Sequence, residues 1–254
     1  MSRPADPKAH SALVAAARAE FVKKGLRGAR IEDITAACGL SKGAFYLHFA
    51  SKEALFDEVV QALASAMRAL HSARTVGLEE VGAERGRLTA RDVELRTPRY
   101  RRYLALETEF DQQALQMMWE HRDTLDVLIR GCAGTAFEGL VWTFLEEEVA
   151  RARAEFQAMQ RSGAGRGDVE AELFAELAVG AYFLVGKRLS RLAERPDLEA
   201  WASTLQRLIH GGALASRGAP GLAHARRGAP TRCGRPVGGR TAAPRRPAKR
   251  RRTP

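Results

Sequence analysis

The sequence predicts an all-α fold, with a small helical domain at the N-terminus, a larger helical domain after it and a basic tail. Two observations favour helices throughout the body. Apolar residues recur at helical spacing rather than at every second position. One such stripe consists of Leu55, Val59, Leu63, Ala66 and Leu70. No stretch alternates apolar and polar residues between hairpin turns, so strands are not expected.

Capping residues place the first helices. Asp6, which a proline follows, is a good start for the first helix, and Gly25 can end it. A short second helix begins near residue 31 and ends at Gly39. Ser41 can cap a third helix that runs to about residue 47, and Ser51 can cap a fourth.

The rest of the body shows longer helical patterns after a weak segment. Residues 77–98 contain three glycines and many charges, which predicts an irregular segment between two domains. Helical patterns follow at about 99–119, 133–161, 168–193 and 197–210. The expected domains are therefore 7–67, 68–214 and the tail 215–254.

The net charge of +11 comes from the end of the chain. Residues 215–254 contain 12 arginines and lysines and no acidic residue, whereas residues 1–214 carry 29 basic and 30 acidic side chains. A nucleic-acid interface in the body must therefore be inferred from a motif and not from the charge. The tail is rich in Arg, Gly, Pro and Ala, so we expect it to be disordered.

Composition excludes several other classes of protein. Hydrophobic residues make up 45% and charged residues 28%, which is typical of globular domains. The longest apolar run, residues 131–145, is shorter than the roughly 18 residues of a membrane helix. Cys38, Cys132 and Cys233 lie far apart, without metal-binding spacing. We expect a cytoplasmic protein with no membrane segment, metal or cofactor.

Residues 30–49 predict a helix-turn-helix motif, in which the second helix enters the major groove of DNA. Gly39 supplies the positive φ of the tight turn. The apolar residues spaced to fix the angle between the helices are Ile34, Cys38, Leu40 and Phe45. The opposite face is small, basic and hydroxyl-bearing, which suits contact with phosphates and base edges. It consists of Ser41, Lys42, Gly43, Ala44, Tyr46 and His48.

From about residue 7 to 67, the sequence resembles the TetR/AcrR family of bacterial transcriptional regulators. The resemblance rests on Phe21, Gly25, Ile34, Gly39-Leu40-Ser41-Lys42-Gly43, Phe45-Tyr46, His48-Phe49 and Ser51-Lys52-Glu53-Ala54-Leu55-Phe56. It implies a three-helix DNA-binding domain, followed by a larger helical domain that dimerises and holds an effector pocket. It also implies repression as the usual activity.

The resemblance implies DNA contacts at eight positions. They are Arg30, Ser41, Lys42, Gly43, Ala44, Tyr46, His48 and Lys52. Tyr46 and Lys52 match positions that touch the phosphate backbone. His48 does so too, but packing beside its aromatic neighbour is an equally good interpretation. Arg30 replaces the usual capping Thr or Ser and can still reach a phosphate, and Ala44 replaces a frequent Thr while keeping a methyl group for thymine.

The middle helices gather large apolar side chains, which form either a core or an effector pocket. The pocket candidates are Tyr103, Phe110, Met118, Trp119, Arg122 and Trp142. Arg122, which lies near aromatic residues, is the candidate anchor for the carboxylate or phosphate of an acyl-type effector. Two apolar stripes near the end of the body favour a C2 dimer through a four-helix bundle. The candidate interface residues are Phe174, Leu177, Ala181, Val185, Leu205 and Leu208.

Two functions stay open at this point. The first is a homodimeric repressor that an unidentified small-molecule effector releases from a palindromic double-stranded DNA operator. The second is an architectural or non-specific DNA-binding protein driven by the basic tail. We do not expect an enzyme, because the sequence shows no phosphate loop, nucleophile elbow, metal cluster or paired carboxylates.

Overall fold

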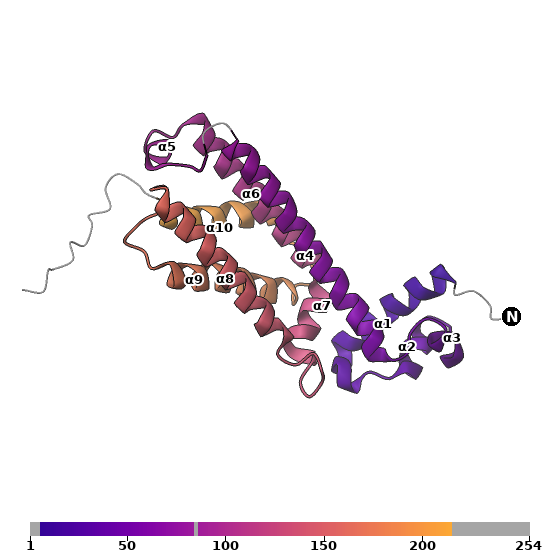
Figure 1. Cartoon of the computed structure of the whole chain (residues 1–254). Coiled ribbons are helices and arrows are strands. Elements are labelled where there is room, and N and C mark those ends of the chain that lie inside the picture. Colours follow the sequence, from indigo (N-terminus) through magenta and orange to yellow (C-terminus); the bar gives the residue numbers. More distant parts are fainter. Residues whose placement is uncertain (1–5, 84–85, 215–254) are drawn as a thin grey trace, which may run out of the picture. The chain divides into compact units, whose positions relative to one another are not determined.

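The computed structural model describes residues 6–83 and 86–214, and the expected tail at 215–254 lies outside these residues. Within them the chain forms ten α-helices and one π-helical turn, η1 (Figure 1). The elements are α1 (Pro7–Gly28), α2 (Ile31–Ala37), α3 (Lys42–Tyr46), α4 (Lys52–Gly82), α5 (Ala90–Glu94), α6 (Pro98–Glu120), α7 (Arg122–Asp126), η1 (Val127–Gly131), α8 (Leu140–Arg161), α9 (Ala171–Leu189) and α10 (Leu198–Ala213). The all-α prediction is confirmed. None of these helices is both long and apolar enough to cross a membrane.

The predicted caps start the first, third and fourth helices. The Asp6 carboxylate accepts a hydrogen bond from a backbone N–H of the first turn of α1, at 3.0 Å. The hydroxyl oxygens of Ser41 and Ser51 do the same for α3 and α4, each at 3.1 Å. Gly25 interrupts α1 with φ +70°, and Gly39 forms the turn between α2 and α3 with φ +68°.

The fourth helix is longer than its sequence pattern predicts. We expected an irregular segment from Gly77 onward, but α4 continues to Gly82. The reason is a close approach by α6. A Cβ atom at Gly77 would lie 2.6 Å from Leu106 Cδ1, so the missing side chain makes room for that leucine instead of ending the helix. α4 also runs without a break through the expected domain boundary at residues 67–68.

The start of α8 corrects a second prediction. The helical pattern begins at Ala133, whereas α8 begins at Leu140. Gly134 and Gly139 adopt φ +71° and +84°, which are left-handed conformations that interrupt a right-handed helix. The Glu138 carboxylate accepts the Gly134 N–H at 2.8 Å and so stabilises the loop between them.

The core around α1–α3 continues into the rest of the molecule. Its fully buried residues on α1 to α4 include Leu13, Phe21, Ile34, Phe45, Leu55 and Phe56. Val127 of η1 and Cys132 belong to the same cluster, and α1 packs directly against η1. All described residues form one compact unit.

Candidate DNA-binding face and effector cavity

The helix-turn-helix angle is fixed from inside by Ile34 and Phe45, both 0% exposed. Thr35 is also buried, and its hydroxyl donates to the backbone carbonyls of residues 31 and 32 at 3.0 and 3.1 Å. The hydroxyl group is therefore satisfied within its own helix, which makes its burial inexpensive. The motif brings the predicted core residues together and leaves the outer side of α3 open to solvent.

That outer side presents Lys42 and Tyr46. The Tyr46 side chain is 51% exposed, and its ring packs edge-on against Phe45. The Lys42 ammonium lies 2.6 Å from Glu32 Oε1, and this hydrogen bond raises the pKa of Lys42. Both partners of the ion pair are exposed, so exchanging Glu32 for a phosphate costs little. Ser41 and Gly43 are exposed beside them, and Ala44 is half-buried.

Of three other predicted contacts, Lys52 and His48 also interact within the chain itself. The Lys52 ammonium donates to the backbone carbonyls of Arg27 and Ala29, both at 2.9 Å, and so ties the start of α4 to the end of α1. His48 is half-buried, with its ring 5.8 Å from His10 and 6.4 Å from the following aromatic ring. Arg30 is exposed at the start of α2 and makes no capping bond with its side chain.

A cavity of about 430 Å³ opens among α4, α6, α7, η1, α8, α9 and α10. This volume is within the range of small-molecule sites. Most of the wall is apolar. Its larger apolar side chains are Leu63, Met67, Tyr103, Phe110, Met117, Met118, Phe144, Phe156, Phe174 and Phe183.

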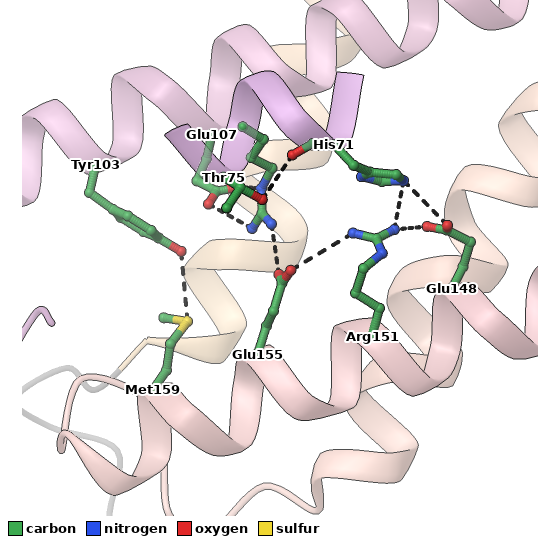
Figure 2. Close-up of polar contacts among 9 residues, drawn as sticks. His71, Thr75, Tyr103, Glu107, Glu148, Arg151, Glu155 and Met159 are labelled. Atoms are coloured by element: carbon green, nitrogen blue, oxygen red, sulfur yellow. Dashed lines mark hydrogen bonds and ion pairs between the residues drawn. The ribbon is translucent and has the colours of Figure 1, made fainter. Parts of the chain in front are cut away.

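One side of the cavity wall carries a network of charges between α4, α6 and α8 (Figure 2). Arg74 donates to both carboxylate oxygens of Glu107, at 3.2 and 2.8 Å, and to Glu155 at 2.7 Å. Arg151 donates to Glu148 and approaches His71 Nε2 at 2.8 Å. Glu107 is 1% exposed, so its carboxylate depends on the guanidinium of Arg74 for neutralisation.

Burial changes the protonation of two further groups on this wall. It lowers the pKa of His71 to about 4, with help from Arg151 and Arg74, so the imidazole is neutral at pH 7. It raises the pKa of Asp111 to about 7, although the hydroxyl of Tyr182 donates to Asp111 Oδ1 and opposes the rise. The other oxygen, Asp111 Oδ2, is buried and has no hydrogen-bond partner among the residues that the structure describes.

Comparison with known proteins identifies the N-terminal part. A family model described as "Bacterial regulatory proteins, tetR family" matches residues 13–59, which include α2 and α3. The chain is 49% identical over 41 residues to the HTH-type transcriptional repressor DhaR of Mycobacterium sp. (strain GP1), covering 16% of this chain and 21% of DhaR. It is 28% identical over 168 residues to the uncharacterized HTH-type transcriptional regulator YdgC of Bacillus subtilis (strain 168), covering 66% and 74% of the two chains. The chain thus matches about a fifth of the length of DhaR.

The described fold extends the likeness beyond the motif. A TetR family transcriptional regulator from Chloroflexus aurantiacus J-10-FL matches with a TM-score of 0.58, at 14% identity, over 83% of this chain and 95% of that one. Residues 13–59 match the TetR family of bacterial regulatory proteins, and the described residues share the fold of a TetR-family regulator. The predicted resemblance to TetR/AcrR sequences is thereby confirmed for the N-terminal part of the chain.

The TetR-family fold brings only part of the predicted pocket set together. Tyr103, Phe110 and Met118 line the cavity, whereas Trp119, Arg122 and Trp142 do not. The Arg122 guanidinium lies over the Trp119 ring, 4.3 Å from its centroid, and donates to the backbone carbonyl of Trp119 at 3.1 Å. Trp142 is 59% exposed. The structure therefore gives Arg122 no place beside a ligand in this cavity.

The predicted dimer residues also fall into two groups. Leu177 on α9 and Leu208 on α10 are 66% and 71% exposed. Phe174 stacks on Phe156 at the cavity wall, and Val185 and Leu205 pack around a buried cluster within the chain. Ala181 is half-buried. Two further leucines of α9, Leu173 and Leu184, are exposed as well and lie outside the predicted interface set.

The sequence pattern does not reveal the charged wall of the cavity. Its members are His71, Arg74, Glu107, Asp111, Glu148, Arg151, Glu155 and Tyr182. Contacts such as Arg74 to Glu107 and Arg74 to Glu155 join residues 33 and 81 positions apart, which helical periodicity does not reveal. A signal does exist on α6, where Glu107 and Asp111 fall inside an apolar stripe.

Proposed function

We propose that this chain is a homodimeric repressor, which binds a palindromic operator and leaves it when a small molecule occupies the cavity. The observation that carries the proposal is the capped, solvent-exposed α3 within the same compact unit as a largely apolar cavity. Lys42 and Tyr46 suit contact with phosphates, because one is cationic and the other carries an exposed hydroxyl-bearing ring. The name of DhaR records repression by that relative.

Selection of bound DNA from a random pool, followed by a footprint, tests the proposal on the full chain. A single protected palindrome supports it. Lys42→Ala should weaken binding to all DNA sequences, whereas Arg207→Ala, an equal loss of charge at an exposed position on α10, should change binding much less. Equal losses for the two variants would refute a role for α3.

Exposed leucines on α9 and α10 support the proposal that the chain forms a dimer. Leu173, Leu177 and Leu184 on α9 and Leu208 on α10 are each more than half exposed. Large apolar side chains grouped on two helices mark a surface that a partner covers. A second copy fits the proposed operator, because a two-fold axis places two recognition helices on the two halves of a palindrome.

The turn η1 offers a physical route between cavity and motif. Leu128 and Ile129 line the cavity, and Gly131 of the same turn touches Gly25 in α1. A Cβ atom at Gly131 would lie 3.2 Å from Gly25 Cα. We expect Gly131→Ala to change the ratio of operator affinities with and without effector, whereas Gly82→Ala, which meets open space, should not. An unchanged ratio in Gly131→Ala would exclude this route.

The charge of the basic tail favours a second candidate function, that of an architectural DNA-binding protein. Its 12 positive charges have no acidic neighbours, so it must attract DNA without regard to sequence. If about four charges per tail contact phosphate, a dimer truncated after residue 215 should have a salt slope shallower by roughly 7 units. Broad protection of DNA that disappears with the tail would favour the architectural function over the repressor.

A further inference from the structure

Asp111 is the acidic one of two groups in the cavity wall, with His71, that have a buried polar atom without a hydrogen-bond partner in the described part of the chain. It is 1% exposed and lines the cavity from α6. Oδ1 accepts from the Tyr182 hydroxyl, whereas Oδ2 has no hydrogen-bond partner in the described part of the chain. A buried carboxylate oxygen without a donor is costly, and a ligand that brings a donor recovers that cost.

The guanidinium groups beside it are already occupied. All three nitrogens of Arg74 donate to Glu107 or Glu155. Arg151 donates to Glu148 and approaches His71. An anionic ligand that approached Arg74 or Arg151 would therefore have to break existing ion pairs, which disfavours a carboxylate or phosphate on this side of the cavity.

The formal charges of the lining balance, so the groups nearest to Asp111 decide which ligand charge is favoured there. The acidic groups of the lining are Glu107, Asp111, Glu148 and Glu155, and its basic groups are Arg68, Arg74, Arg151 and Lys187. Arg68 is exposed and donates to Ser65, so its charge is largely solvated. Glu107 and Asp111 lie one turn apart on α6, where like charges repel each other and a cation relieves the repulsion.

We propose that the effector is a hydrophobic amine, whose ammonium group donates to Asp111 Oδ2 while its apolar part lies against the aromatic and aliphatic wall. This inference rests on the proposed function, because it names the class of small molecule for the cavity of the regulator. It replaces the prediction of an acidic effector anchored by Arg122, because Arg122 lies outside the cavity lining.

Calorimetric titration of the full-length chain with three compounds of equal tail tests the proposal. The probes are 4-phenylbutylamine, 4-phenylbutan-1-ol and 4-phenylbutyrate. The amine should bind about tenfold or more tighter than the alcohol, as a charge-assisted hydrogen bond to a buried carboxylate requires, and the carboxylate should bind weakest. Asp111→Asn should reduce the gap between amine and alcohol to about twofold or less. Glu109→Gln, an exposed carboxylate on the same helix outside the lining, should leave the gap unchanged.

Several results would refute the proposal of an amine effector. They are equal binding of amine and alcohol, tighter binding of the carboxylate, a gap that survives Asp111→Asn, and no binding of any probe. The comparison of probes on the wild-type chain stands even if a variant folds poorly. Operator selection is measured separately, so a regulator that selects DNA but ignores amines refutes this inference alone. Amine binding by a chain that selects no DNA refutes the proposed function alone.

Discussion

Arg74→Met should destabilise the fold by about 3–5 kcal/mol, because it removes the guanidinium from a carboxylate that stays buried. The Arg74 side chain is 13% exposed and that of Glu107 only 2%, so solvent cannot replace the lost partner. The second pair, with Glu155, contributes less because that carboxylate is 39% exposed. For a body of this size the loss corresponds to a melting temperature lower by about 6–20 °C.

Urea unfolding at pH 7 and one fixed protein concentration measures this loss, since a dimer makes the stability concentration-dependent. Arg102→Met is the matched control. Arg102 and Glu80 form an ion pair at 3.3 Å, but both side chains are more than 60% exposed, so the control should scarcely change the midpoint. Adding Glu107→Met to Arg74→Met should recover much of the stability, because the buried carboxylate that lost its partner is then removed as well. Equal midpoints for Arg74→Met and Arg102→Met would refute the reasoning.

Three further predictions concern the DNA face, the dimer and the cavity. Tyr46→Phe should weaken binding to an operator and to its mutated versions about equally in equilibrium titrations, and a loss confined to one base change would contradict a backbone contact. Leu177→Arg with Leu208→Arg should give a monomer in the ultracentrifuge, and a wild type that is already monomeric at micromolar concentration would contradict the interface. Asp111 has a pKa of about 7 when folded against 3.8 ordinarily, so between these values the folded state binds more protons and the unfolding free energy falls as pH rises. Asp111→Asn should abolish this fall, which amounts to at most about 4 kcal/mol, and a pH dependence equal to that of the wild type would refute the raised pKa.

Local signals were sufficient to predict the N-terminal helices. The side-chain caps at Asp6, Ser41 and Ser51 and the positive φ of Gly25 and Gly39 depend on residues within a few positions of each other. Such interactions can be predicted from the sequence because they need no partner from elsewhere in the fold. The helix-turn-helix motif and its exposed face followed from the same signals.

Glycines outside the helix-turn-helix motif are the reason why two helix boundaries were predicted wrongly. Gly77 reads as a helix breaker, but its role is to let Leu106 of α6 approach α4. Gly134 and Gly139 do interrupt the chain, although the surrounding apolar pattern is helical. The same residue type thus marks a close approach in one place and a left-handed turn in another, and only the partner helix distinguishes them.

Helix α6 shows why the cavity wall escaped prediction and how such walls can be recognised. Its inward stripe mixes aromatic, aliphatic and acidic positions. The members are Tyr103, Glu107, Phe110, Asp111, Ala114, Met117 and Met118. Helical periodicity assigns the apolar members to a core and the carboxylates to solvent, yet all face one space. A solid core rarely accepts a carboxylate, since burial without a partner is too costly. Acidic positions in phase with an apolar stripe therefore distinguish a helix that lines a cavity from one that fills a core.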